Sequence, residues 1–228
     1  ALGAIDHVRA SFTYVNLASE LGIDPKDPDR PWRFRADQGG GALYDIGAYA
    51  INACTHVAAS VPTRVAAFGR PANEFGTSDK IMGLIDYANG VVGMIEASEI
   101  SDSTQELQIS AELGTLYLPF SWTIYDETEI TIRRSVPTSH RDNERIFRTI
   151  DDRLAVPRSN AFQDQLLNVA EVVRGASSPR VSLAETVVNT FTMEALAASL
   201  LAREEVDVAV PSAVAEAFLG ASQARATV

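Results

Sequence analysis

The chain has 228 residues, of which 46% are hydrophobic and 21% are charged, and it carries a formal net charge of −11. This charge disfavours nucleic acid as a partner, because phosphate binding needs a concentrated basic face, and no apolar run approaches the ~20 residues of a membrane helix. The single cysteine, Cys54, excludes an internal disulfide framework and favours a cytoplasmic location, and three scattered histidines give no metal-ligand spacing.

The first predicted elements are a strand, a loop and a helix. Residues 7–16 are predicted as a strand because apolar and polar side chains alternate there, with one apolar face formed by Val8, Ala10, Phe12 and Tyr14. Residues 22–31 contain three prolines and three aspartates, a composition typical of a loop. A helix is predicted from residue 42 to residue 58, with a buried side formed by Leu43, Ile46, Ala50, Cys54 and Val57.

The middle of the chain is predicted to be mostly strands. Their ranges are 63–69, 80–87, 91–99, 105–113, 115–118, 122–125, 129–134 and 146–150. The second and third form a hairpin, because Asn89-Gly90 between them supplies the positive φ angles of a tight turn. Short connections between consecutive strands favour antiparallel pairing.

Helical periodicity returns over residues 160–174 and 183–203, and an Ala-rich tail at 212–228 is expected to fray or to form a short helix. Ser182 is the predicted N-cap of the second of these helices, with Glu185 three residues later. The fold class is therefore predicted as α+β, a single domain over residues 1–228, with an open, largely antiparallel sheet of six or more strands and helices packed on one face. The other face would need a partner, which favours a homo-oligomer.

Polar side chains form a stripe along the helix predicted at 42–58. Asp45, Tyr49, Asn52 and His56 are spaced four, three and four residues apart, which places them on one side of a helix. Two interpretations stay open: a functional stripe, or one half-exposed helix face on which His56 is structural. The preceding glycines, Gly39 to Gly41, favour function, since free N–H groups at a helix N-terminus suit a polar or anionic ligand.

These glycines do not make a dinucleotide-binding motif. G-x-G-x-x-G requires a third glycine where the sequence has Tyr44, and the residues before Gly39 are not a buried strand. No phosphate-binding GxxxxGK[ST] loop occurs either. The chain is therefore predicted to have no nucleotide-binding module of its own.

The segment WRFRADQGGGALYDIGAYAIN, which starts at Trp32, resembles the C-terminal domain of the glucose–fructose oxidoreductase, inositol dehydrogenase and rhizopine catabolism (Gfo/Idh/MocA) family. With tyrosine at its last position, the DIGAY motif is most similar to that of the glucose–fructose oxidoreductase and dihydrodiol dehydrogenase branches. The later F-x-x-Q at Phe162 to Gln165 also fits the family's order of elements, so the resemblance covers essentially the whole chain. It implies that an N-terminal Rossmann domain is absent, which would explain the start at Ala1.

The resemblance also implies a function: substrate binding and dimerisation in an oxidoreductase that uses NAD or NADP and acts on a sugar, cyclitol or related polyol. Tyr49 matches the family's proton-transfer residue and Asp45 its orienting carboxylate. The cofactor, and a lysine of an E-K-P motif, would come from the absent domain. This chain alone is then expected to be inactive, and no metal is expected.

Three further residues are candidates for substrate binding: Trp32, Arg33 and Asn52. For Trp32 the alternative is packing in the core, and for Arg33 it is a structural ion pair. Two other functions stay open for the whole chain. One is a stand-alone, non-catalytic module for polyol binding or scaffolding, and the other is a pure dimerisation domain in which the glycines serve only the backbone.

Overall fold

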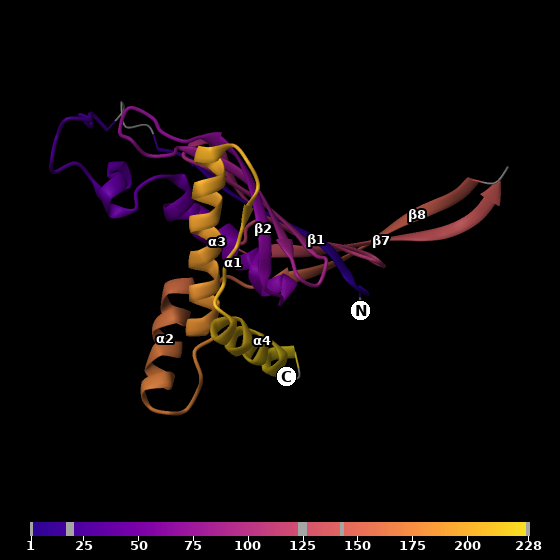
Figure 1. Ribbon diagram of the computed structural model, residues 1–228. Helices are drawn as coiled ribbons and strands as arrows, with labels where there is room; N and C mark the ends of the chain where they lie inside the picture. Colours follow the sequence, from indigo (N-terminus) through magenta and orange to yellow (C-terminus); the bar gives the residue numbers. More distant parts are fainter. Residues whose placement is uncertain (1, 17–20, 123–126, 142–143, 227–228) are drawn as a thin grey trace.

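A computed structural model of the chain describes residues 2–16, 21–122, 127–141 and 144–226 (Figure 1). Within these ranges nine strands form one sheet, in the order β8-β7-β6-β5-β1-β4-β3-β2-β9. The strands are β1 (Ile5–Val15), β2 (Pro62–Arg70), β3 (Lys80–Tyr87), β4 (Val92–Ser98), β5 (Ile100–Ala111), β6 (Gly114–Leu118), β7 (Thr128–Arg141), β8 (Glu144–Val156) and β9 (Val206–Asp207).

The sheet is antiparallel at every pairing except one. β1 and β4 run parallel, from His7 opposite Val92 to Thr13 opposite Ser98, and β1 pairs antiparallel with β5 on its other side. The predicted α+β class with an open, largely antiparallel sheet is therefore confirmed. The hairpin of β3 and β4 is also confirmed, and Gly90 adopts a φ of 86° in its turn.

The strands of the second half are longer than predicted. β7 and β8 pair from Thr128 opposite Val156 to Arg141 opposite Glu144, whereas the sequence pattern predicted only residues 129–134 and 146–150. Backbone hydrogen bonds extend this ladder through polar stretches that have no apolar alternation. Figure 1 shows the two strands projecting from the sheet as an arm. The two-residue β9 was not predicted, and most of the strand predicted at 122–125 lies outside the described residues.

The helices are α1 (Ala48–Ala58), α2 (Ala161–Val173), α3 (Leu183–Ala202) and α4 (Ser212–Ala226). Two short 3-10 turns, η1 (Trp32–Phe34) and η2 (Ala36–Gln38), lie before a turn of π-helix, η3 (Leu43–Gly47), which leads directly into α1. The helix predicted over 42–58 is therefore confirmed, with its first turn wider than a regular α-helix. Ser182 caps α3 as predicted, since its hydroxyl accepts from the Glu185 N–H at 3.1 Å.

The core lies between one face of the sheet and the helices α1 and α3. α1 packs on β1 and β4, and α3 packs on β2 and on α1. The fully buried aliphatic side chains come from both layers: Val8, Ile51, Val65, Ile81, Ile85, Val188 and Leu196. Cys54 is buried as predicted, and this burial raises the pKa of its thiol to about 12. No helix among the described residues is long and apolar enough to span a membrane.

Candidate active site

An aromatic cluster lies where β1 meets α1. Phe12 faces the helix side of the sheet, and its ring meets the ring of Tyr49 edge-on, with the centroids 5.5 Å apart. Trp122 stacks on Phe12 at 6.1 Å and lies 6.2 Å from Tyr49, and its indole N–H donates to the Ser11 carbonyl at 3.2 Å. The cluster holds the Tyr49 ring in place while 49% of the residue stays exposed.

The Tyr49 hydroxyl is free to meet a ligand. None of the described residues forms a hydrogen bond with it, although the ring packs on Phe12 and Trp122. A phenol at the edge of an aromatic surface can exchange a proton with a ligand hydroxyl, while the rings contact the apolar face of the same ligand. This combination makes the cluster of Phe12, Tyr49 and Trp122 the candidate binding surface.

A carboxylate lies one helical turn before Tyr49 and is held from two sides. Oδ2 of Asp45 accepts hydrogen bonds from the Tyr14 hydroxyl at 2.9 Å and from Arg33 Nε at 2.7 Å. Oδ1 has a longer contact, 3.4 Å, from an Nη atom of Arg33. The Asp45 side chain is only 11% exposed, so its two partners replace much of the water it would otherwise bind.

Arg33 links this carboxylate to Trp32. The centre of its guanidinium lies 4.6 Å from the centroid of the Trp32 ring, a cation–π geometry, while 44% of the Arg33 side chain remains exposed. Arg33 therefore forms an ion pair with Asp45, which was the alternative predicted for this residue. Trp32 is 40% exposed, so the alternative of packing in the core is wrong.

The surroundings of Asp45 shift the acidity of its neighbours. Burial raises the pKa of Tyr14, and the carboxyl groups of Glu99 and Asp45 raise it further, so Tyr14 stays a protonated donor. Burial also raises the pKa of Glu99 to about 8, with the charge of Asp45 as the next cause. Glu99 is 4% exposed, and its Oε1 has no hydrogen-bond partner within the described ranges. At neutral pH, Glu99 is therefore mostly a neutral acid beside the Asp45 side chain.

The predicted polar stripe divides between two environments. Its first half, Asp45 and Tyr49, faces β1 and the aromatic cluster. Its second half packs against α3: Asn52 Nδ2 donates to Glu185 Oε1 at 3.3 Å, and His56 Nδ1 lies 3.2 Å from the same oxygen. The Glu185 side chain is fully buried, so these contacts bind α1 to α3. Asp45, Arg33 and Trp32 thus form one connected group, and Tyr49 lies one helical turn after Asp45 in the aromatic cluster. Asn52 and His56 lie with α3.

The glycine run shapes the backbone and does not make an anion site. Gly39 and Gly41 have φ angles of 73° and 102°, and a Cβ on Gly40 would lie 2.5 Å from the carbonyl oxygens of Trp32 and Arg33. The Ala42 N–H donates to Ser78 O at 2.7 Å, and the Asp45 N–H donates to Gly41 O at 3.0 Å. The N–H groups of Gly39 and Gly40 also donate to backbone carbonyls, of Ala36 and Arg35, so these four amides are not open to a ligand.

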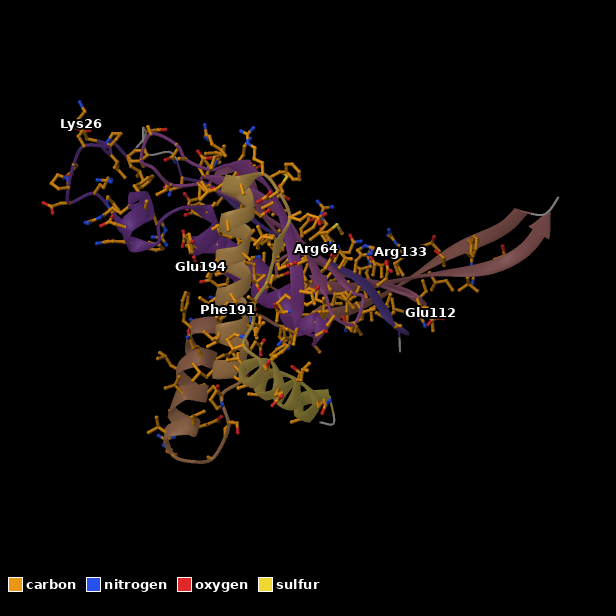
Figure 2. The ribbon with its side chains drawn as sticks, in the orientation of Figure 1. Lys26, Arg64, Glu112, Arg133, Phe191 and Glu194 are labelled. Carbon is orange, nitrogen blue, oxygen red and sulfur yellow. The ribbon has the colours of Figure 1, made fainter. Side chains whose placement is uncertain are left out.

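Four residues of the site were not identified from the sequence: Phe12, Tyr14, Glu99 and Trp122. The alternation of β1 correctly predicts that Phe12 and Tyr14 share a face, but the helix opposite that face is fixed only by tertiary packing. Glu99 lies directly after β4, and no pattern distinguishes it from a surface glutamate. Glu194, labelled in Figure 2, accepts from the Tyr44 hydroxyl at 3.2 Å and binds the start of the helix to α3.

The opposite face of the sheet is apolar at its centre. Phe68, Met82 and Leu84 point away from the helices and are 75%, 57% and 48% exposed. Together with neighbours from β1, β2 and β4 they line a shallow hollow, whose charged members are Arg9 and Glu96. We call this surface the free face of the sheet.

Comparison with known proteins gives consistent matches over this fold. A family model described as the GFO/IDH/MocA C-terminal domain matches residues 1–117. A curated relative, D-xylose 1-dehydrogenase (NADP(+)) 2 of Haloferax volcanii, is 22% identical over 197 residues, which cover 86% of this chain and 54% of the relative.

Solved structures match a similar share of this chain and of their own length. KijD10, a 3-ketoreductase from Actinomadura kijaniata crystallised with NADP and TDP-benzene, gives a TM-score of 0.67 at 21% identity over 87% of this chain and 55% of that one. An aldose-aldose oxidoreductase from Caulobacter crescentus gives a TM-score of 0.69 at 18% identity, over 90% of this chain and 56% of that one. The chain therefore shares its fold with these proteins and spans about half of their length.

Proposed function

Because the chain belongs to the GFO/IDH/MocA family, we propose that it is the substrate-binding and dimerisation domain of an NAD(P)-dependent oxidoreductase acting on a sugar, cyclitol or related polyol. The observation that carries this proposal is the half-exposed Tyr49 at the edge of the aromatic cluster, with Asp45 one helical turn before it and Arg33 bonded to Asp45. The names of two relatives, a xylose dehydrogenase and an aldose-aldose oxidoreductase, support a sugar-like substrate.

The nicotinamide cofactor would be bound mainly by a preceding domain. One relative is named for NADP(+), and another was crystallised with NADP, whereas the sequence of this chain contains no G-x-G-x-x-G motif. When bound, a nicotinamide supplies hydride chemistry at a carbinol or carbonyl carbon. The chain by itself is accordingly proposed to be inactive.

Tyr49 is the proposed proton-transfer residue. In the direction of carbonyl reduction, its phenol donates a proton to the substrate oxygen as that oxygen becomes a hydroxyl. In the direction of oxidation, the hydroxyl proton moves to the Tyr49 oxygen, which needs a base or a cationic partner nearby. We expect that partner to be a lysine of the preceding domain, as the family resemblance implies.

Asp45 and Arg33 would position the substrate. Among the described residues, only Arg33 makes a hydrogen-bond contact to Oδ1 of Asp45, and it is long, so this oxygen can accept a hydrogen bond from a substrate hydroxyl. Arg33 offers its exposed N–H groups, and Trp32 offers a ring on which an apolar sugar face can lie. Because the Asn52 amide donates to buried Glu185, we leave Asn52 outside the proposed substrate contacts.

The free face of the sheet is the proposed dimer surface. Phe68, Met82 and Leu84 expose a contiguous apolar centre that a monomer would leave in water. A second copy related by a two-fold axis would bury this centre against itself.

The test is turnover of the full-length protein with NAD or NADP and a panel of aldoses and cyclitols. Tyr49→Phe should lower kcat by about 10²-fold or more, because it removes the transferred proton and leaves the ring in place. Tyr44→Phe is the matched control on the same helical segment, since its hydroxyl bonds Glu194 outside the site, and it should keep wild-type turnover. Wild-type turnover in Tyr49→Phe would contradict the proposed role, and sugar binding without any turnover would favour the non-catalytic module.

A further inference from the structure

Helix α2 carries an apolar stripe that nothing in the described chain covers. Phe162, Leu166, Val169 and Val173 are 71%, 70%, 53% and 81% exposed, and α2 contains no buried residue. At 100° per residue these four side chains fall within a sector of about 60° on the helix. Such a stripe is the pattern of a helix that packs on a hydrophobic partner.

Polar contacts fix which side of α2 faces outward. The Asn160 side chain caps the helix through the N–H groups of Phe162 and Gln163. Asn168, roughly opposite the stripe, accepts from the Arg180 N–H at 3.2 Å and donates to the Ser178 carbonyl at 3.4 Å. The loop before α3 is therefore hydrogen-bonded to the polar side of α2. Val169, at one edge of the stripe, borders this loop at a hollow that Pro179 and Val181 also line, and the other three stripe residues are 70–81% exposed.

The proposed dimer surface does not account for this stripe. The free face carries Phe68, Met82 and Leu84, whereas α3 packs on the other side of the sheet. Only residues 174–182 separate α2 from α3, and Figure 1 shows α2 extending away from the sheet beyond its helix layer. A second copy docked on the free face would therefore lie across the sheet from the layer that carries α2.

The part of the relatives that this chain does not match indicates which partner covers the apolar stripe of α2. The chain covers 54% of the xylose dehydrogenase and 55% of the ketoreductase, and the family model that it matches is a C-terminal domain. The remaining part of these relatives therefore precedes the matched region. The aromatic cluster, which the proposed function places opposite the cofactor, is likewise on the helix side of the sheet. One preceding domain can contact both surfaces.

We propose that Phe162, Leu166, Val169 and Val173 form the surface on which the preceding, cofactor-binding domain packs, so that α2 holds that domain over Tyr49. This inference rests on the proposed function for the existence of that domain. It adds that α2, which contributes nothing to the core of its own domain, contributes its apolar stripe to the domain interface.

The experiment compares Leu166→Asp with Leu167→Asp in the full-length protein. Leu167 is 55% exposed on the opposite side of α2, so it is a matched control of the same type on the same helix. Leu166→Asp should accelerate amide hydrogen exchange across residues 161–173 by about tenfold or more and should split one thermal unfolding transition into two. Leu167→Asp should behave as the wild type in both measurements.

Several results would overturn the proposal. Unchanged exchange and a single transition in Leu166→Asp would show that the stripe packs on nothing in the full-length protein. Loss of a dimer in sedimentation, with exchange in 161–173 that depends on protein concentration, would show that a second copy covers it instead. Neither readout requires sugar turnover, so failure of the Tyr49→Phe test leaves this interface test intact.

Discussion

The carboxyl groups around Asp45 have unequal environments. Asp45 has a hydroxyl donor and a guanidinium donor, whereas Glu99 is buried beside it without a described partner for Oε1. Burial, and next the charge of Asp45, therefore raise the pKa of Glu99, which holds its proton into the neutral range.

This difference predicts how stability changes with pH. The pKa of Glu99 is raised from 4.5 to about 8 in the folded protein, so between these values the folded state binds a proton that the unfolded state has lost. The contribution of Glu99 to the free energy of unfolding is therefore highest below pH 4.5 and falls until the pH passes about 8. Chemical denaturation of the wild type and of Glu99→Gln at several pH values measures this contribution.

Glu99→Gln keeps a neutral side chain of the same shape, so it should gain stability relative to the wild type as the pH rises from 5 to 8. Glu96→Gln is the control, because Glu96 lies on the other side of the sheet, where it accepts from Ser11. A constant difference between Glu99→Gln and the wild type across this range would show that Glu99 is ionised in the folded protein.

At the scale of single residues, the sequence predicted positions better than contacts. Helical spacing and the DIGAY motif identify Asp45 and Tyr49 as candidates, and the structure places both at the start of the predicted helix. Tyr14 and Phe12 were predicted to be on the buried face of a strand, but their contact with this helix depends on β1 lying beneath α1. That placement results from the parallel pairing of β1 with β4, which no local pattern encodes.

At the scale of elements, the turn before η3 positions the site. The 3-10 turns η1 and η2 bring the carbonyls of Trp32 and Arg33 against Gly40, and this approach leaves no space for a Cβ. Arg33 reaches Asp45 from this turn. The glycine run therefore contributes to the site indirectly, by fixing the backbone from which Arg33 extends.

Gly40→Ala should accordingly destabilise the domain by about 1–3 kcal/mol, because the added methyl group forces two backbone carbonyls away. Gly220→Ala is the control: a Cβ there meets no atom within 4 Å, and alanine favours a helix. The free energy of unfolding from urea denaturation measures both. Equal stability of Gly40→Ala and the wild type would mean that the turn is looser than its backbone contacts indicate.

The long helices and the hairpin at Asn89-Gly90 were predictable because each has a strong local signal, an apolar stripe or an obligatory turn residue. The extended β7–β8 pair was not, since its outer half is polar. Arg133, labelled in Figure 2, pairs with Asp151 across these strands at 2.9 Å. This charge pair lies in the inner half of the arm, and the backbone ladder continues beyond it to Arg141 opposite Glu144.

At the scale of the whole molecule, the sheet separates the two proposed surfaces. The helix side carries the aromatic cluster and Asp45, and the free face carries Phe68, Met82 and Leu84. The sequence predicted that an open sheet would leave one face needing a partner. It could not predict which strands would make that face apolar, since this depends on the order β1-β4-β3-β2.

Met82→Lys should weaken the proposed homodimer by about tenfold or more, because a charged ammonium replaces an apolar side chain at the centre of the interface. Leu113→Lys is the matched control, since Leu113 is also 57% exposed but lies at the turn between β5 and β6. Sedimentation equilibrium measures both dissociation constants. A Met82→Lys protein that dimerises as tightly as the wild type would exclude the free face as the interface.

The most direct measurement is a crystal structure of the full-length protein with a nicotinamide cofactor and a sugar substrate. We expect the sugar to lie against Tyr49 and Trp122, with one hydroxyl within hydrogen-bond distance of the Tyr49 oxygen and another near Oδ1 of Asp45. A sugar bound on the free face of the sheet, or one that contacts neither Tyr49 nor Asp45, would contradict the assignment of this site.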